Sequence, residues 1–400
     1  MASNGKTFGT AVKRWEGIGP YYAMFPIRFA DAVIKKHTSA GDTVLDPFAG
    51  RGTALFSATA LRRRGFGVEI SPVGWVYARA KLGPAPLEQV EKRLLEIVDA
   101  GSKYAEQARS LPKFFKKCFS PSVRRFLLAT RDNLDWRRCT CDRTLMAILL
   151  VYLHGKEGQS LSNQMRQTKA MSPHYAINWW DENGTKPPDL DVATFMQQRI
   201  RWRYSKGVVK ANGSQVFLGN SITILPQLEQ RLHKDQVPKA KLLLTSPPYF
   251  GVTNYHYDQW LRLWLLGFEA DAYVTRGPYQ GRFTHPDRYR VLLKKVFCRA
   301  ANVVADDAVI YVRTSKDLFT KKATLDAMRE TFPKKRLVER CRPFRKPTQT
   351  HLFGDKTPKP GEIDLILMPS IAAKYRTGIA NGRRPTTACG RGRYGSRGTP

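Results

Sequence analysis

The sequence is short of cysteine, of acidic residues and of long apolar runs. Its 400 residues include six cysteines, and none of them forms a CxxC pair. Cys139 and Cys141 have no second pair at the spacing of metal ligands, so we expect reduced thiols, with neither disulfides nor a metal site. The longest apolar run, residues 145–153, falls well below the roughly 18 residues of a membrane span.

The first residues, Met-Ala-Ser-Asn-Gly-Lys, lack the apolar core of a secretion signal, so we expect a cytoplasmic protein without membrane attachment. Lys and Arg number 67 against 33 Asp and Glu, which gives a net charge of +34 and a pI of about 10.2. Such an excess favours a polyanionic partner, because cations placed on phosphates release condensed counterions. A merely solvated basic surface is the simpler alternative.

The first eighty residues alternate between helical and strand patterns. We predict a helix over 28–37, a strand over 43–46, a helix from Thr53 to about Arg64 that Gly65 ends, and a strand over 67–70. Ser71-Pro72 then suits the start of another helix. This alternation predicts an α/β fold with a doubly wound, mostly parallel sheet.

Residues 83–212 have a different character. They are expected to be mostly helical, are rich in Arg, Lys and Trp, and contain Trp179-Trp180 and Arg201-Trp202-Arg203. Strand patterns resume at 215–218, 241–245, 308–313 and 363–368, with a helix around 258–266. We therefore predict four parts: a cofactor half over 1–82, a helical insert over 83–212 that could read DNA, a catalytic part over 213–372, and a basic Gly/Arg-rich disordered tail over 373–400.

A glycine-rich loop lies between the first strand and its helix. Its sequence is Asp46-Pro47-Phe48-Ala49-Gly50-Arg51-Gly52-Thr53. Glycines let the backbone approach a ligand, and a helix N-terminus offers free N–H groups. Glu69, at the end of the next strand, is placed to accept hydrogen bonds from ribose hydroxyls. No lysine follows the glycines, so this is not a phosphate-gripping P-loop. A tight turn followed by an exposed glutamate is the alternative reading.

This loop resembles motif I of the amino-methylating (N4-cytosine or N6-adenine) DNA methyltransferases. The resemblance implies a Rossmann-like S-adenosylmethionine-dependent methyltransferase fold, with S-adenosylmethionine as cofactor. It implies that Asp46 contacts the methionine amino group, that Glu69 holds the ribose and that Ile70 packs on the adenine. The cofactor's amino-acid end would contact the loop residues Pro47, Phe48, Ala49, Gly50, Gly52 and Thr53.

Two further segments carry the resemblance less strongly. Residues 19–26 look like the family's motif X, which implies cofactor contacts for Tyr22, Phe25 and Pro26. Asn220 follows the strand over 215–218 where motif III would place a contact to the adenine. Arg51 departs from the pattern, because a small residue is commoner there; it is expected to crowd the loop or to reach a DNA phosphate.

The strand over 241–245 runs directly into Ser246-Pro247-Pro248-Tyr249. Consecutive prolines stiffen a strand end and leave local carbonyls without competing donors. We predict that the Ser246 hydroxyl and the Pro247 carbonyl accept both protons of an exocyclic amine, while Tyr249 stacks on a flipped base. The nitrogen lone pair could then attack a methyl sulfonium in line. A proline-bracketed turn after a core strand is the alternative.

Within the same family, Ser at the first position of Ser-Pro-Pro-Tyr favours N4-cytosine over N6-adenine. The sequence thus predicts a site-specific DNA methyltransferase that acts on double-stranded DNA by base flipping, alone or with a cognate restriction endonuclease. An N6-adenine enzyme, an RNA base methyltransferase and a catalytically silent DNA-binding subunit remain alternatives. Residues 254–257 could line the base pocket, with His256 taking up a proton or lying at the surface, and residues 258–267 are expected to be a packing helix.

Overall fold

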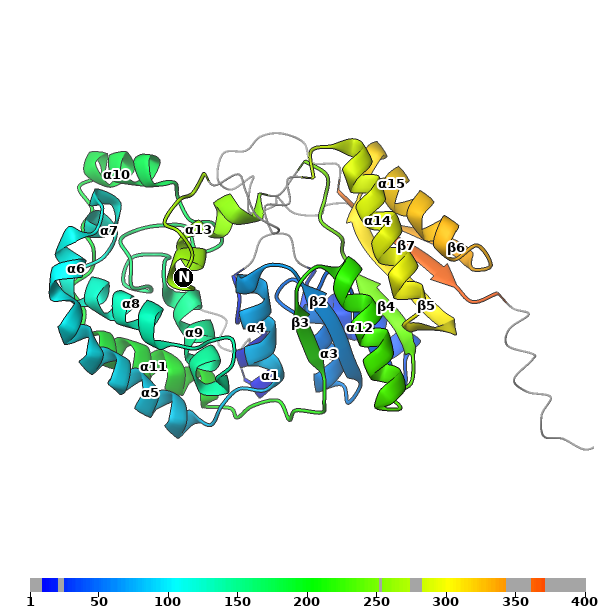
Figure 1. Cartoon of the computed structure of the whole chain (residues 1–400), viewed down its shortest axis with the longest axis horizontal. Helices are drawn as coiled ribbons and strands as arrows, with labels where there is room; N and C mark the ends of the chain where they lie inside the picture. Colours follow the sequence, from blue (N-terminus) through cyan, green and yellow to red (C-terminus); the bar gives the residue numbers. More distant parts are fainter. Residues whose placement is uncertain (1–8, 21–24, 252–253, 274–282, 343–360, 371–400) are drawn as a thin grey trace, which may run out of the picture.

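The computed structural model describes residues 9–20, 25–251, 254–273, 283–342 and 361–370. Figure 1 shows an α/β half beside a helical lobe. One seven-stranded sheet has the order β3-β2-β1-β4-β5-β7-β6. Its strands are β1 (Thr43–Asp46), β2 (Arg64–Glu69), β3 (Gln215–Leu218), β4 (Ala240–Thr245), β5 (Val304–Ser315), β6 (Arg336–Arg342) and β7 (Glu362–Met368).

The sheet is parallel from β3 to β5 and antiparallel at β7. Strand β1 pairs with β2 on one side and with β4 on the other, where Val44 lies opposite Leu242. Strand β7 runs antiparallel to both β5 and β6. The reversal of strand order between β1 and β4 is the switch point at which doubly wound sheets bind ligands. The predicted doubly wound, mostly parallel sheet is confirmed.

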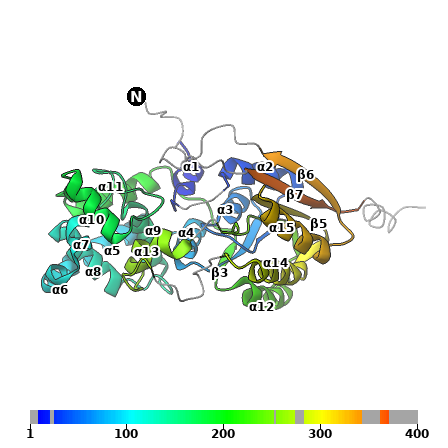
Figure 2. The same ribbon diagram turned by 90° about the horizontal axis from the view of Figure 1, so that it is seen from above.

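Helices cover both faces of this sheet, as Figure 2 shows from above. On one face α2 (Ile27–His37) and α3 (Thr53–Ala60) pack against Val44 and Leu242. On the other, α12 (Ser221–Lys234), α14 (Pro286–Ala301) and α15 (Leu318–Thr331) pack against Leu45 and Leu243. Successive side chains of a strand point to opposite faces, so each buried strand supplies both cores.

Helix α3 ends at Ala60, four residues earlier than predicted, and Gly65 lies inside β2 rather than at a helix end. The reason is close packing between the two elements. A Cβ at Gly65 would lie 2.9 Å from the Leu55 Cα, so this glycine lets β2 pass directly beside α3. The terminal edge strand β6 was not predicted.

The helical lobe is built largely from the predicted insert. Helix α4 (Pro72–Leu82) leads into it, α1 (Ala11–Glu16) packs beside α11, and a short 3₁₀ turn, η1 (Gly101–Tyr104), follows α5. Its helices are α5 (Leu87–Ala100), α6 (Ala105–Ser110), α7 (Lys113–Cys118), α8 (Pro121–Asn133), α9 (Thr140–Tyr152), α10 (Pro173–Glu182) and α11 (Val192–Tyr204).

Helix α13 (Tyr255–Leu265) also packs in this lobe, although it follows β4 in the chain. Trp260 and Arg262 are fully buried. The Arg262 guanidinium donates to the carbonyls of Leu150, at 2.9 Å, and Gln167, at 2.5 Å. The packing helix expected over 258–267 is therefore present, and it ties the part after β4 to the lobe. The proposed boundary at 212/213 does not account for this connection.

Among the described helices, none is long and apolar enough to cross a membrane. The same portion of the chain holds no cluster of three His, Cys, Asp or Glu side chains placed to bind a metal ion. Its five cysteines, Cys118, Cys139, Cys141, Cys298 and Cys341, are all free thiols.

Candidate active site

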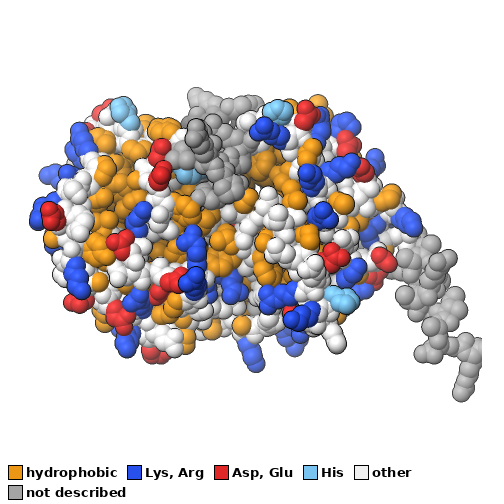
Figure 3. Space-filling view, viewed as in Figure 1, with side chains coloured by type: hydrophobic (Ala, Val, Ile, Leu, Met, Phe, Trp, Pro, Cys, Tyr) orange, Lys and Arg blue, Asp and Glu red, His pale blue; other side chains and the backbone are white. Residues whose placement is uncertain are grey.

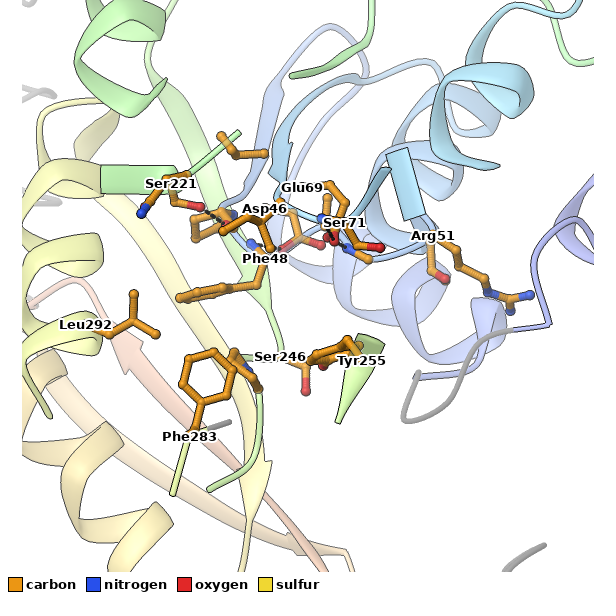
Figure 4. A pocket seen from close by; sticks show the side chains of 18 of the residues that line it. Asp46, Phe48, Arg51, Glu69, Ser71, Ser221, Ser246, Tyr255, Phe283 and Leu292 are labelled. Atoms are coloured by element: carbon orange, nitrogen blue, oxygen red, sulfur yellow. Dashed lines mark hydrogen bonds between the residues drawn. The ribbon is translucent and has the colours of Figure 1, made fainter. Parts of the chain in front are cut away.

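One pocket opens at the carboxyl ends of β1, β2 and β4 (Figure 4). Gly50 of the glycine loop and Ser246 of the strand end line the same cavity, so the two predicted halves of the site come together. The predicted site residues that line it are Phe25, Asp46, Pro47, Phe48, Ala49, Gly50, Thr53, Glu69, Ile70, Asn220, Ser246 and Pro248. Pro26, Gly52, Pro247 and Tyr249 do not line it, and Tyr22 lies outside the described residues.

Asp46 is buried at the end of β1. Its Oδ1 accepts a hydrogen bond from the Thr245 hydroxyl at 2.6 Å and from the Phe48 N–H at 3.1 Å. Burial raises the pKa of this carboxyl to about 7, against the lowering effect of both hydrogen bonds. The Thr245 contact also joins the end of β1, where the glycine loop begins, directly to the end of β4.

Glu69 is buried at the end of β2. Its carboxylate accepts hydrogen bonds from the Gly50 N–H at 2.6 Å and the Ser71 N–H at 2.8 Å. Burial again raises the pKa to about 7. The alternative of a tight turn followed by an exposed glutamate is therefore wrong, because Glu69 organises the loop and lines its pocket.

The loop can lie flat on α4 because of its glycines. Gly50 and Gly52 both have positive φ, 53° and 75°, a conformation that favours glycine. A Cβ at Gly52 would lie only 2.7 Å from the Ala78 Cβ of α4. The backbone thus approaches both the helix behind it and the cavity in front.

Arg51 extends away from the pocket in Figure 4. Its guanidinium donates to the carbonyls of Glu16 and Gly19, each at 3.0 Å, and burial lowers its pKa to about 10. The expectation that Arg51 crowds the loop or reaches DNA phosphate is wrong, since it anchors the segment after α1. No other Lys or Arg is among the described pocket residues, whereas two carboxyls are. The site is therefore suited to a cationic ligand.

The strand end after β4 is held by hydrogen bonds from two elements. The Tyr249 hydroxyl donates to the Glu362 carboxylate of β7 at 3.0 Å and lies 3.5 Å from the Ser246 hydroxyl. The Tyr289 hydroxyl of α14 donates to the Pro248 carbonyl at 3.0 Å. Burial raises the pKa of Tyr249 well above its ordinary value, so the phenol stays protonated. The acceptor roles of Ser246 and Pro247 and the stacking role of Tyr249 stay predictions.

Asn220 has a structural role in addition to lining the pocket. Its side chain caps α12 by accepting from the Ile222 N–H at 2.9 Å, which accounts for a residue of this type at a helix start. The neighbouring Ser221 hydroxyl donates to the Pro47 carbonyl at 2.5 Å. Sequence reasoning did not assign Ser221, nor the further lining residues Val68, Ser71, Phe283 and Leu292.

The residues after Asn254 divide into different roles. Tyr255, the first residue of α13, lines the pocket as the sequence indicated. His256 is buried, and its Nε2 bonds the Asp271 carbonyl at 2.8 Å. It is therefore neither a surface histidine nor a lining residue of the cavity. The sequence also has a basic run over residues 342–351, for which DNA contact and simple solvation are equal alternatives. This run lies almost wholly outside the described residues.

Comparison with known proteins relates the chain to one family. Residues 4–74 match the DNA methylase family of N6- and N4-type methyltransferases. Over these residues the chain is similar to the amino-methylating DNA methyltransferases. The match, together with the strand order, confirms the resemblance and the predicted Rossmann-like methyltransferase fold.

A curated relative of this chain is the type II methyltransferase M.MjaII of Methanocaldococcus jannaschii, 27% identical over 125 residues. The match covers 29% of this chain and 24% of the relative, so the chain spans about a quarter of the relative's length. Similar solved structures include the rRNA methyltransferase aviRa of Streptomyces viridochromogenes, 13% identical, covering 92% of this chain and 94% of that one, with TM-score 0.34. Another is TrmN of Thermus thermophilus, 9% identical, covering 90% and 53%, with TM-score 0.33.

Proposed function

We propose that this protein transfers a methyl group from S-adenosylmethionine to the exocyclic amine of a flipped base in double-stranded DNA, with cytosine N4 as the acceptor. The observation that carries the proposal is the shared pocket. The buried carboxyls of Asp46 and Glu69 and the hydroxyl of Ser246 line one cavity, although they come from two distant parts of the chain. A bound cofactor and an amine could therefore meet there.

The residues of the pocket fit S-adenosylmethionine. This molecule carries an ammonium and a sulfonium cation, a ribose diol and a flat adenine. Asp46 and Glu69 supply carboxylates for the cations and the diol, while Phe48, Ile70 and Leu292 supply apolar surface for the ring. Burial disfavours the ionised form of both carboxyls, and the cationic groups of a bound cofactor would favour it again. When bound, the cofactor supplies an electrophilic methyl group.

The strand end supplies the other part of the chemistry. An exocyclic amine is a weak nucleophile because its lone pair is delocalised into the ring. The Ser246 hydroxyl and the Pro247 carbonyl would accept its two protons and turn the lone pair toward the methyl carbon. Two hydrogen bonds hold this turn in place before the substrate binds, one from Tyr289 to the Pro248 carbonyl and one from Tyr249 to Glu362. Positioning and electrostatics would then provide the rate enhancement.

Charge and the family match support DNA as the substrate. Lys and Arg side chains are spread over both halves of the face shown in Figure 3, in keeping with the net charge of +34. Ser246 at the first motif position favours cytosine N4, and adenine N6 is the alternative acceptor. The enzyme would act by itself or beside a cognate restriction endonuclease.

Nucleoside analysis tests the proposal. The protein is incubated with double-stranded DNA and S-adenosylmethionine, the DNA is digested to nucleosides, and the products are identified by mass spectrometry. We expect N4-methylcytosine, and none with Asp46→Ala as the control. N6-methyladenine would overturn the cytosine assignment alone. Methylation of RNA but not of DNA would overturn the DNA assignment, and methylation of neither, with no cofactor binding, would overturn the function.

A further inference from the structure

A second, larger cleft lies in the helical lobe and is not used by the proposed reaction. Its volume is about 1020 Å³. It is bounded by the end of α9, the segment after it, α10, α11 and the first turn of α13. A cleft of this size can hold a drug-sized organic ligand.

The cleft has the opposite charge character to the active site. Its lining includes Lys156, Arg166, Lys169 and Arg199, and none of the described lining residues is Asp or Glu. The Nε of Arg199 is buried without a hydrogen-bond partner among the described residues, while its guanidinium lies 4.6 Å from the Phe195 ring centre. The partly exposed Lys169 also forms an ion pair with the buried Asp258, at 2.8 Å. The cleft is therefore suited to an anion.

Aromatic rings lie among these cations. Tyr175, Trp179 and Tyr257 all line the cleft, and Tyr175 is 57% exposed although it is large and apolar. The Lys169 ammonium lies 4.8 Å from the Tyr257 ring centre. Cations for phosphate beside exposed ring faces for bases form the usual surface for unpaired nucleotides. An acidic peptide would use the cations but leave the ring faces without a matching partner.

Helix α13 connects the cleft to the active site. Tyr255 lines the catalytic pocket, and Tyr257, two residues later, lines the cleft. Residues two apart on a helix point in nearly opposite directions, so the first turn of α13 separates the two cavities. One helix is about 10 Å thick, a distance that neighbouring nucleotides of one strand can span.

We infer that the cleft between α9, α10, α11 and α13 binds an unpaired nucleotide of the substrate strand next to the base being methylated. Its base stacks on Tyr175 and Trp179, and its phosphate contacts Lys156 and Arg199. This inference rests on the proposed function, because it takes the strand in the catalytic pocket as its reference. It gives the helical lobe a single-strand site rather than only a general affinity for DNA.

Photocrosslinking tests the inference without requiring turnover. The full-length protein is irradiated with a short oligo-dT that carries one 5-iododeoxyuridine, and the adducts are located by peptide mass spectrometry. We expect adducts on Tyr175, Trp179 or Tyr257. Adducts confined to Tyr255 or Phe283 would overturn the cleft assignment and leave the proposed function intact. No adduct, together with no S-adenosylmethionine binding by calorimetry, would overturn both.

Affinity measurements by fluorescence anisotropy use matched variants. Tyr175→Ala should weaken oligo-dT binding at least about fivefold, the lower end for removing one base-stacking ring, whereas Tyr175→Phe should bind like the wild type. Lys156→Gln should reduce the slope of log K against log salt by about 0.7. The control Lys234→Gln, an exposed cation of α12, should leave that slope unchanged. Equal slopes for both lysine variants, or displacement of oligo-dT by poly-glutamate at lower concentration than by unlabelled oligo-dT, would overturn the inference.

Discussion

Asp46 and Glu69 are unusual carboxyls, because burial raises the pKa of each to about 7. At neutral pH each carries a proton in a substantial fraction of ligand-free molecules. A cationic ligand favours the ionised form, so its binding must release protons. The same burial that opposes charge in the free protein therefore makes the pocket responsive to pH.

We accordingly expect S-adenosylmethionine to bind more tightly at pH 8 than at pH 6. Below the raised pKa values, affinity should fall by up to about tenfold per pH unit for each carboxyl that must ionise. Titration calorimetry in two buffers of different ionisation enthalpy would count the released protons. Asp46→Asn should bind more weakly and release fewer protons. A wild-type affinity that does not change between these pH values would contradict the role of both carboxyls.

Tyr249 allows its ring and its hydroxyl to be tested separately. If the ring stacks on the base, Tyr249→Ala should lower kcat/KM by about 5- to 150-fold, the range of one stacking contact. Tyr249→Phe keeps the ring but loses the bond to Glu362, so its loss should be smaller. Both variants should bind S-adenosylmethionine normally by calorimetry. Unchanged turnover in Tyr249→Ala would remove the stacking role.

At the scale of elements, the glycine loop packs against α4 on one side and lines the pocket on the other. The contact that a Cβ at Gly52 would make with Ala78 is too short for ordinary packing. Gly41 offers a matched comparison, because it also has positive φ, 89°, but a Cβ there would meet nothing within 4 Å. The two positions thus separate the cost of backbone conformation from the cost of steric overlap.

Gly41→Ala should lower the free energy of unfolding by about 1–2 kcal/mol, the cost of a left-handed non-glycine residue. Gly52→Ala should cost a further 1–3 kcal/mol or so, because α4 must move to admit the methyl group. Urea unfolding of the two variants measures the difference. Equal losses would show that the loop does not depend on contact with α4.

Several elements were predictable from sequence because their patterns are local. The runs over 43–46 and 241–245 are largely apolar strands with turn residues beside them. The glycine loop directly follows the first strand, and Ser246-Pro247-Pro248-Tyr249 directly follows the second. Strand β6, at the sheet edge, was missed because Arg336–Arg342 has four charged residues and no regular alternation of apolar and polar residues. The position of α13 could not be predicted either, since its burial depends on contacts with Leu150 and Gln167, far away in the chain.

The same distinction applies within the active site. Asp46, Glu69 and Ser246 are found by motif, because each stands at a strand end whose neighbours identify it. Phe283 and Leu292 line the pocket only because α14 packs on the sheet, and no short motif marks them. Arg51 was misjudged because its partners, the carbonyls of Glu16 and Gly19, carry no signal in the sequence.

For the whole molecule, the basic charge is distributed along the chain and also concentrated at its end. Seven of the Lys and Arg residues follow Ser370, with no Asp or Glu among them. Deleting residues 371–400 should weaken binding to duplex DNA and reduce its salt slope by about 0.9 for each phosphate that these cations neutralise. Nucleoside and sequence mapping of the product should show the same modified base at the same site. A changed site would mean that these residues read DNA sequence.

The hydrogen bond between Thr245 and Asp46 has a consequence for how the protein is made. The walls of the catalytic pocket run from Phe25 to Leu292 along the chain. A ribosome must therefore release most of the polypeptide before the cavity can close around a ligand. The cofactor cannot assist the early stages of folding, and a prematurely terminated chain that ends within the helical lobe would be made without the ability to retain it.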